Sequence, residues 1–279
     1  MPGYISLLDE IVVYTRSEGF HTIHVSTYPD GLPLCAMPEP WCNGSNITML
    51  LRPRSLTSFA AGLFWVDAFN ERHPGAEVRL VLPFIPGARQ DRLNSEGDWL
   101  FTVKSVARMI NSRCFAQVIV LDPHSDVAPA LIERCKVVRS HEIEMGAGEL
   151  ESRKYSAVVS PDSGAEKRAA AFARRLRIPL VHSWKTSDLS DGRISRFGHE
   201  PLPNDGPLLI VDDICDGGGT FAMIGEMLKA NGAKWVGLYV THGIFSKGWT
   251  IPNIDRCFTT RSYRSDQPEH VTVLRHPME

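Results

Sequence analysis

The amino-acid sequence predicts an α/β protein of two domains, each with a mainly parallel sheet flanked by helices. Short apolar runs rich in β-branched residues alternate with longer stretches of helical periodicity, an alternation typical of parallel sheets. At 279 residues the chain has room for about two domains of roughly 150 residues each. Charged or glycine-rich segments directly follow several of the apolar runs, and sheets of this class bind ligands at those strand ends.

The first half of the chain is predicted to hold three strand–helix units. Ile47–Leu51 is an apolar run typical of a strand, and Ser55–Arg72 repeats apolar residues at helical spacing until Pro74-Gly75 ends the helix. The same reasoning predicts two further strands and two further helices, in the order Val78–Phe84, Val103–Ile110, Val118–Asp122 and Val127–Arg134.

The second half repeats this pattern after a polar segment, Arg139–Tyr155, which is the predicted connection between the halves. Strands are expected over Ala157–Ser160, Leu180–Ser183, Leu208–Asp213 and Trp235–Thr241, and helices over Ala165–Leu176 and Phe221–Lys229. We therefore expect an N-terminal domain over residues 1–140 and a C-terminal domain over 141–264, with helices on both faces of each sheet.

Composition and charge exclude several classes of protein. With 43% hydrophobic and 22% charged residues, the chain is neither disordered nor collagen-like in composition. Its 30 Lys and Arg against 32 Asp and Glu give a formal net charge of −2, so we expect no nucleic-acid partner. We expect no membrane partner, because no apolar run approaches the ~18 residues of a spanning helix. The six cysteines form no Cys-x-x-Cys pair and the N-terminus lacks a signal-peptide pattern, which favours free thiols and a cytoplasmic location.

The strongest local signal lies at the end of the strand predicted over Leu208–Asp213. Three acids and three glycines follow in order there, before a predicted helix: Asp212, Asp213, Asp216, Gly217, Gly218 and Gly219. Glycines let main-chain amides approach an anion closely, and a helix N-terminus attracts negative charge. Carboxylates suit sugar hydroxyls or a hard cation. Thr220 either caps the helix or donates its hydroxyl to a phosphate.

This segment resembles the ribose-phosphate-binding motif of the phosphoribosyltransferase superfamily, and the other strand ends narrow the family. Pro83–Arg92 matches the ATP-loop signature of the ribose-phosphate pyrophosphokinases, also called phosphoribosyl pyrophosphate synthetases. Its Arg89 and Arg92 can meet a polyphosphate from two sides, and Gln90 can reach a phosphate or ribose oxygen.

Four more segments match the same family. Val120–Asp126 is similar to its Asp-x-His segment, and Ser160–Arg168 to its Ser-Pro-Asp-x-Gly segment. Tyr28–Gly31 resembles its aromatic-x-Asn/Asp-Gly loop, and Thr241–Ser246 its Thr-His-Gly-Ile-x-Ser strand end.

The resemblance implies two phosphoribosyltransferase-like domains and an enzyme that transfers the diphosphoryl group of ATP to O1 of ribose 5-phosphate, giving phosphoribosyl pyrophosphate and AMP. It assigns ATP to Arg89, Gln90 and Arg92, and ribose 5-phosphate to Asp212, Asp213, Asp216 and the glycine loop Gly217–Thr220. It also implies that the tail 265–279, with a strand at Val271–Leu274, returns to the first domain.

The resemblance further implies Mg²⁺ as the cofactor, with His124 and Asp162 at the metal sites. It implies a homo-oligomer, at least a dimer, in which Tyr28 and Asp30 reach the adenine of a neighbouring subunit. Simpler roles stay open for single residues. His124 alone fits a structural histidine, Asp162 a helix N-cap, and Arg168 a solvated or acid-pairing side chain.

The catalytic loop departs from the family pattern. Lys185 stands at the loop's lysine, but Ser187 stands where the family has an arginine, and Arg193 or Arg196 could replace that arginine. We therefore expect Lys185 and Arg193 to be the catalytic residues. Leu32 stands where the adenine loop of the family carries a glutamate.

Two other functions remain open. One is a phosphoribosyltransferase that consumes phosphoribosyl pyrophosphate, which would use the glycine loop but leaves Arg89, Gln90 and His124 without a purpose. The other is a non-catalytic regulatory homologue of the synthetase, which the missing arginine favours and the intact phosphate loop opposes.

Overall fold

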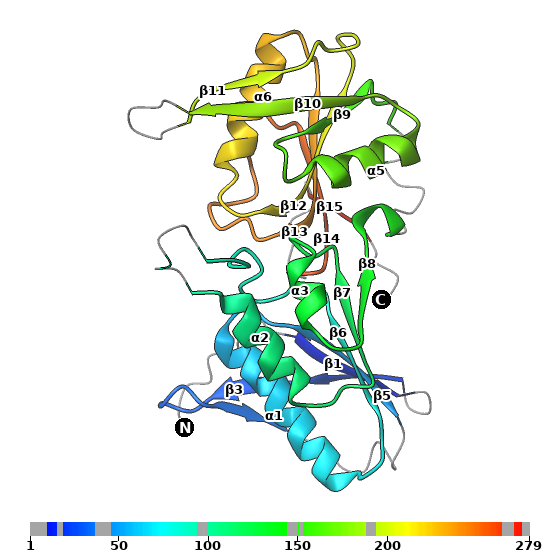
Figure 1. Ribbon diagram of the computed structural model, residues 1–279, viewed down its shortest axis with the longest axis vertical. Helices are drawn as coiled ribbons and strands as arrows, with labels where there is room; N and C mark the ends of the chain where they lie inside the picture. The colour runs from blue at the N-terminus through cyan, green and yellow to red at the C-terminus, as the bar shows by residue number, and fades with distance from the viewer. Residues whose placement is uncertain are drawn as a thin grey trace. The chain divides into compact units, whose positions relative to one another are not determined.

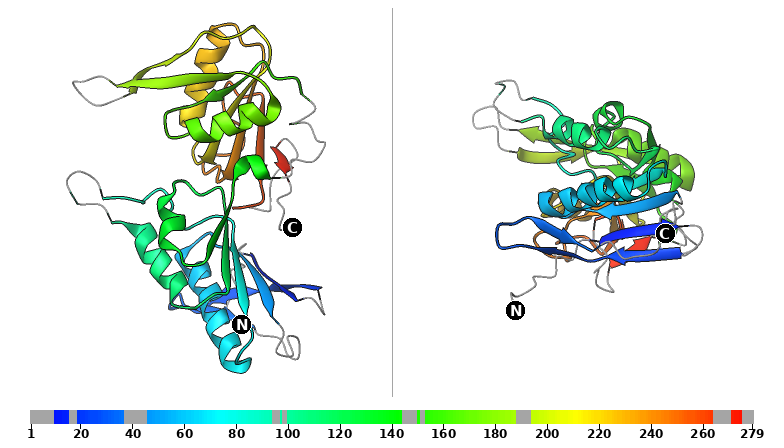
Figure 2. Two further views of the ribbon diagram at one scale, coloured as in Figure 1. Left: turned by 45° about the vertical axis from the view of Figure 1, so that its right-hand side comes forward. Right: turned by 90° about the horizontal axis from the view of Figure 1, so that it is seen from below.

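The computed structural model describes residues 10–15, 19–36, 46–93, 97, 100–143, 150, 153–187, 194–263 and 271–274. The chain divides into two compact units, Met1–Val138 and Arg139–Glu279, and each unit has its own large sheet (Figures 1 and 2). In the described part of the chain, no helix is long and apolar enough to span a bilayer.

The sheet of the first unit has six strands in the order β2-β1-β5-β6-β7-β8. β1 pairs antiparallel with β2 and β5, and the remaining neighbours are parallel. The strands are β1 (Glu10–Thr15), β2 (Gly19–Ile23), β5 (Ile47–Arg52), β6 (Val78–Leu82), β7 (Gln117–Leu121) and β8 (Cys135–Val138). A separate antiparallel hairpin holds β3 (Val25–Thr27) and β4 (Pro33–Cys35).

The described helices of the first unit lie on one face of its sheet, where the sequence predicted both faces. They are α1 (Leu56–Arg72), α2 (Thr102–Asn111) and α3 (Val127–Leu131), and their buried side chains share one apolar cluster with the sheet (Figure 1). The cause is topological. Strands β5 to β8 are neighbours in chain order, and right-handed crossovers that always step in the same direction place every helix on the same side.

The sheet of the second unit has seven strands in the order β11-β10-β9-β12-β13-β14-β15. They are β9 (Ala157–Ser160), β10 (Leu180–Ser187), β11 (Ile194–His199), β12 (Leu208–Cys215), β13 (Val236–Gly243), β14 (Arg256–Thr260) and β15 (Val271–Leu274). Only the β10–β11 pair is antiparallel among the described pairs. The described helical segments are the short 3₁₀ turn Ser140–Glu142, α5 (Glu166–Leu176) and α6 (Gly219–Ala230).

Here the two helices cover opposite faces, because the crossover from β9 to β10 and the crossover from β12 to β13 step in opposite directions. The side chains of β12 alternate accordingly. Leu209 and Val211 pack in the cluster that contains Phe172 of α5, whereas Leu208 and Ile210 pack with residues of α6. The central strands are thus buried on both faces of the sheet. Polar residues of this unit gather instead at the carboxyl ends of these strands, which the helices leave uncovered.

The tail strand corrects one expectation. β15 pairs in parallel with β14, with Cys257 opposite Val271, so this strand belongs to the second sheet and its predicted return to the first domain is wrong. An apolar strand joins whichever edge offers unpaired main-chain groups, and β14 supplies that edge here. The division between the units falls at Val138, against the predicted boundary at residue 140.

Candidate functional site

The glycine loop connects β12 to α6. Gly218 is the N-cap of α6 and has φ +75°, a conformation that side chains disfavour, and a methyl group on it would lie 3.0 Å from Ile251 Cγ1. The first amides of α6 have no partner within the helix and point toward its N-terminal end. Thr220 is the second residue of α6, so the helix-cap alternative for Thr220 is wrong. The loop thus has the geometry of an anion-binding helix start.

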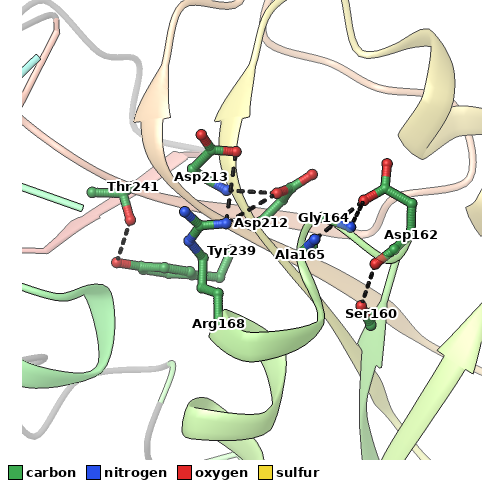
Figure 3. A network of polar contacts seen from close by, with 9 residues as sticks. All are labelled: Ser160, Asp162, Gly164, Ala165, Arg168, Asp212, Asp213, Tyr239 and Thr241. Carbon is green, nitrogen blue, oxygen red and sulfur yellow. Dashed lines mark hydrogen bonds and ion pairs between the residues drawn. The ribbon is translucent and has the colours of Figure 1, made fainter. Parts of the chain in front are cut away.

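The acid pair Asp212 and Asp213, two residues before the end of β12, faces an arginine that the sequence did not single out as functional. Arg168 of α5 places Nη1 3.5 Å from Asp212 Oδ1 and 3.8 Å from Asp213 Oδ1, and its side chain is 10% exposed (Figure 3). The amide of Asp213 also donates to Asp212 Oδ1 at 2.8 Å. Of the two open alternatives for Arg168, the structure therefore supports acid pairing.

Burial raises the pKa of Asp212 well above its ordinary value. The negative charge of Asp213 raises this pKa further, while Arg168 lowers it in part. A carboxyl group in this state holds a proton more readily than an exposed one does. It can therefore donate or accept a hydrogen bond to a sugar hydroxyl.

Asp162 follows β9, the parallel neighbour of β12, so its loop lies at the same edge of the sheet as the acid pair. Its Oδ1 accepts hydrogen bonds from the amides of Gly164 at 3.0 Å and Ala165 at 3.2 Å, and Ser160 Oγ donates to its carbonyl at 2.8 Å (Figure 3). Because Ala165 is itself the N-cap of α5, Asp162 shapes the loop before the helix. The N-cap position is Ala165 and not Asp162, but Asp162 makes N-cap-like hydrogen bonds to the turn that leads into the helix.

Asp216 begins the glycine loop and is tied to the segment after β13. Ser246 donates its amide to the Asp216 carbonyl at 3.1 Å and its hydroxyl to the Asp216 carboxylate. The amides of Ile244 and Phe245 both donate to the carbonyl of Cys215. The Thr241–Ser246 segment, which the sequence matched without a role, therefore holds the glycine loop in place.

In the first unit, the loop after β6 exposes Arg89, Gln90 and Arg92 and buries the aspartate between them. Asp91 is 3% exposed, and Arg92 Nε donates to its Oδ1 at 3.1 Å. The side-chain oxygen of Gln90 accepts a hydrogen bond from Thr102 at the start of α2. This contact holds Gln90 and leaves its NH₂ group as the donor that an anion would meet.

The loop after β7 lies beside the loop after β6, because the two strands are parallel neighbours. His124 is exposed on this loop, and Ser125 donates a hydrogen bond to Asp91. Burial raises the pKa of Asp91, but the hydrogen bonds from Ser125 and Arg92 and the nearby charges of Arg92 and His124 outweigh it and leave the pKa below its ordinary value. Asp91, which sequence reasoning missed, therefore links the predicted ATP loop to the predicted metal residue.

Tyr28 and Asp30 lie in the tight turn between β3 and β4. Tyr28 is 53% exposed, and Asp30 Oδ1 accepts a hydrogen bond from the amide of Leu32 at 3.1 Å. Gly31 has φ +86° and donates its amide to the Tyr28 carbonyl at 2.9 Å. The aromatic-x-Asp-Gly pattern thus builds a turn that presents the tyrosine ring to solvent.

Lys185 lies within β10, opposite Phe197 of β11, and does not begin a loop as the sequence predicted. β10 extends to Ser187 because β11 returns beside it and supplies main-chain partners. Arg193 lies outside the described residues. The neighbouring Trp184 is 49% exposed, and its indole covers Gly198 so closely that a methyl group there would lie 2.6 Å from Cε2.

Among the described residues, no three His, Cys, Asp or Glu side chains form a group that could hold a metal ion by themselves. Mg²⁺ typically takes one or two carboxylates and completes its shell with water and substrate phosphates. Asp162 and the acid pair supply oxygen donors at one sheet edge, so these residues fit a magnesium ion that is bound together with its substrate. His124 is a less usual ligand for so hard an ion.

The chain resembles known proteins over most of its length. Residues 136–270 match the family model described as the phosphoribosyl transferase domain. The chain is 32% identical over 197 residues to the ribose-phosphate pyrophosphokinase of Mesorhizobium japonicum. The aligned region covers 67% of this chain and 60% of that protein. It is 31% identical over 214 residues to the ribose-phosphate pyrophosphokinase of Thermococcus kodakarensis, which covers 75% of this chain and 72% of that one.

A solved structure agrees with the fold. The crystal structure of phosphoribosylpyrophosphate synthetase from Mycobacterium smegmatis superimposes with a TM-score of 0.75 at 22% identity, covering 90% of this chain and 85% of that one. The chain spans 60%, 59% and 55% of the length of three of its curated relatives. With the relative from Thermococcus kodakarensis matched over most of its length and the glycine loop, acid pair and parallel sheets all present, the chain belongs to the ribose-phosphate pyrophosphokinase family.

Proposed function

We propose that the protein is a ribose-phosphate diphosphokinase. It transfers the diphosphoryl group of ATP to O1 of ribose 5-phosphate and forms phosphoribosyl pyrophosphate and AMP. The observation that carries this proposal is that the chain has both the glycine loop at the start of α6 and, after β6, an exposed loop with Arg89, Gln90 and Arg92, which a phosphoribosyltransferase would leave without a purpose. The names of the relatives from Mesorhizobium japonicum and Thermococcus kodakarensis support the same reaction.

Ribose 5-phosphate binds to the second unit in this proposal. The amides of Gly217–Thr220 hold its phosphate, as helix N-termini do for other phosphates. Asp212, with Asp213 and Asp216, accepts hydrogen bonds from the ribose hydroxyls. The contacts that hold these acids before any ligand binds favour a site that is already formed, which reduces the entropy lost on binding.

ATP binds to the first unit. Arg89 and Arg92 neutralise the phosphates, and Gln90 donates its NH₂ group to a phosphate or ribose oxygen. Tyr28 and Asp30 contact the adenine of a neighbouring subunit, so the working enzyme is at least a homodimer. Free thiols at Cys35, Cys114, Cys135, Cys215 and Cys257 support a cytoplasmic location for this enzyme.

The reaction needs alignment and charge neutralisation more than a nucleophilic side chain. O1 of the sugar attacks the β-phosphorus, the bond between that phosphorus and the α–β bridging oxygen breaks, and AMP leaves while the hydroxyl proton passes to solvent. Lys185 and Arg193 stabilise the negative charge on the transferring group. Mg²⁺ would supply charge neutralisation when bound, and His124 and Asp162 would each belong to a magnesium site.

The test is direct. The purified full-length chain, incubated with ATP, ribose 5-phosphate and Mg²⁺, should release AMP and phosphoribosyl pyrophosphate in equal amounts, measured by ³¹P NMR. Reactions without ribose 5-phosphate or with a chelator are the controls. Release of orthophosphate instead of AMP would refute the proposal. So would a product that appears only when phosphoribosyl pyrophosphate and a nucleobase are supplied, which would identify a phosphoribosyltransferase.

One observation favours a second candidate, a non-catalytic regulatory homologue of the synthetase. Ser187 occupies the position of the family's catalytic arginine and lies within β10. Such a homologue would bind ribose 5-phosphate or ATP and yet produce no AMP alone. Calorimetry on the same preparation therefore separates the two candidates, because only the enzyme both binds its substrates and turns them over.

A further inference from the structure

The glycine loop lies beside three acids, which makes it a poor anion site unless a cation is close. Asp212 and Asp213 precede the loop, and Asp216 is its first residue. Arg168 is already paired with Asp212 and Asp213, at 3.5 and 3.8 Å (Figure 3). A phosphate dianion placed on this loop would meet an excess of negative charge from these four side chains.

The turn after β13 brings a lysine to this place. The chain reverses between Phe245 and Gly248, where the Gly248 amide donates to the Phe245 carbonyl at 3.0 Å. Phe245 is buried and packs against the ring of Trp249, with ring centroids 5.0 Å apart. Together with the two hydrogen bonds from Ser246 to Asp216, these contacts fix the backbone on both sides of residue 247 against the glycine loop.

The side chain of Lys247 crosses Gly217. A methyl group on Gly217 would lie 3.2 Å from Lys247 Cδ, 3.3 Å from Cε and 3.5 Å from Cγ, so the stem lies over the space that the missing side chain leaves. The ammonium group is one bond beyond Cε. Lys247 is exposed, so its head remains open to a ligand.

We infer that Lys247 is a phosphate-binding residue, whose ammonium group offsets the nearby carboxylates and pairs with the phosphate of ribose 5-phosphate on the glycine loop. The inference rests on the proposed function for the identity of the sugar phosphate. It adds a role for Gly217, because any side chain at that position would have to displace the lysine stem. Lys247 lies one residue beyond the matched Thr241–Ser246 segment, and neither the composition nor the motifs pointed to it.

The experiment is isothermal titration of the full-length chain with ribose 5-phosphate in the absence of ATP, and separately with inorganic phosphate. Lys247→Met keeps the stem and removes the charge, and Lys247→Arg keeps the charge. Lys234→Met is the matched control. It changes the net charge equally in the same unit, but Lys234 pairs with Asp205 at the opposite edge of the sheet.

The Lys247→Met variant should weaken binding of ribose 5-phosphate by about tenfold to a hundredfold, as expected for loss of a hydrogen bond between charged groups. Its affinity should also depend less on salt concentration than that of the unmodified chain. Lys247→Arg should recover most of the affinity, and Lys234→Met should change it by about twofold or less.

Equal affinities for Lys247→Met and the unmodified chain overturn the inference, and so does an equal loss in Lys234→Met. Failure of the unmodified chain to bind either probe overturns it as well. The proposed function is tested separately by product formation. A chain that binds ribose 5-phosphate through Lys247 yet forms no AMP refutes the diphosphokinase and leaves the role of Lys247 standing.

Discussion

Replacing Arg168 by methionine tests the electrostatic design of the acid pair. At an effective dielectric constant of about 20, unit charges 3.5 Å apart attract by about 5 kcal/mol, and the second acid at 3.8 Å adds a similar amount. The energy of desolvating the guanidinium offsets much of this attraction, and breaking a buried pair typically costs about 3–5 kcal/mol. We expect Arg168→Met to lower the free energy of unfolding of the second unit by about 3 kcal/mol at pH 8.

The loss should be smaller at pH 5. Without the arginine, the pKa of Asp212, already raised, rises further in the folded protein. A carboxyl whose pKa is higher in the folded state than in the unfolded state binds protons more tightly when folded, so the folded variant gains stability as the pH falls. The double variant Arg168→Met/Asp212→Asn should recover part of the loss, because only one of the two acids remains charged.

Thermal unfolding followed by circular dichroism at both pH values is a suitable assay. About 3 kcal/mol corresponds to a fall of about 6–12 °C in Tm for a unit of this size. Lys229→Met, which breaks the partly exposed pair with Asp255, is the control and should cost about 1 kcal/mol or less. The reasoning is refuted if Arg168→Met unfolds at the same temperature as the unmodified chain. It is also refuted if adding Asp212→Asn deepens the loss.

Three further outcomes are expected. Lys185→Ala should lower kcat by about 10²–10³ while circular dichroism stays unchanged, and a fall of only about twofold would remove Lys185 from catalysis. Gly218→Ala should weaken binding of ribose 5-phosphate and lower Tm, because it strains a residue at φ +75° and crowds Ile251. Calorimetry and a melting curve measure the two effects, and an unchanged affinity and Tm would contradict the prediction. Iodoacetamide should label exposed Cys114 in minutes and buried Cys215 only after unfolding, because burial raises the pKa of the Cys215 thiol. Peptide mapping measures the labelling, and equal labelling of the two cysteines in the folded protein would contradict the prediction.

The sequence predicted the parallel core well, because its strands are buried apolar runs. The prediction for Ile47–Leu51 agrees with β5 to within one residue, and that for Ala157–Ser160 agrees with β9. The antiparallel strands were not predicted, and neither were the parallel strands β8 and β14. β1 and β2 form an antiparallel pair at the edge of the first sheet, where polar residues such as His21 and Thr22 interrupt the apolar pattern. Such strands depend on their partner more than on local composition.

In the candidate site too, the local features were predicted from the sequence and the long-range contacts were not. The glycine loop was predictable because its anion-binding geometry is local, from the strand end to the helix start. The partners of the loop were not, because Arg168 reaches Asp212 from another helix and Lys247 reaches Gly217 from another turn. The strand that carries Lys185 was likewise underestimated, since its last residues are held by β11 and not by their own propensity.

The contact between the indole of Trp184 and Gly198 limits which amino acids β11 can carry opposite the strand of Lys185. Any amino acid with a side chain at position 198 must push the ring aside, and the ring is attached to the residue next to the lysine. A substitution at position 198 of β11 would therefore shift the backbone at Lys185, although the two positions are thirteen residues apart in the chain. A substitution at position 198 would therefore change the position of Lys185 by displacing the ring of Trp184.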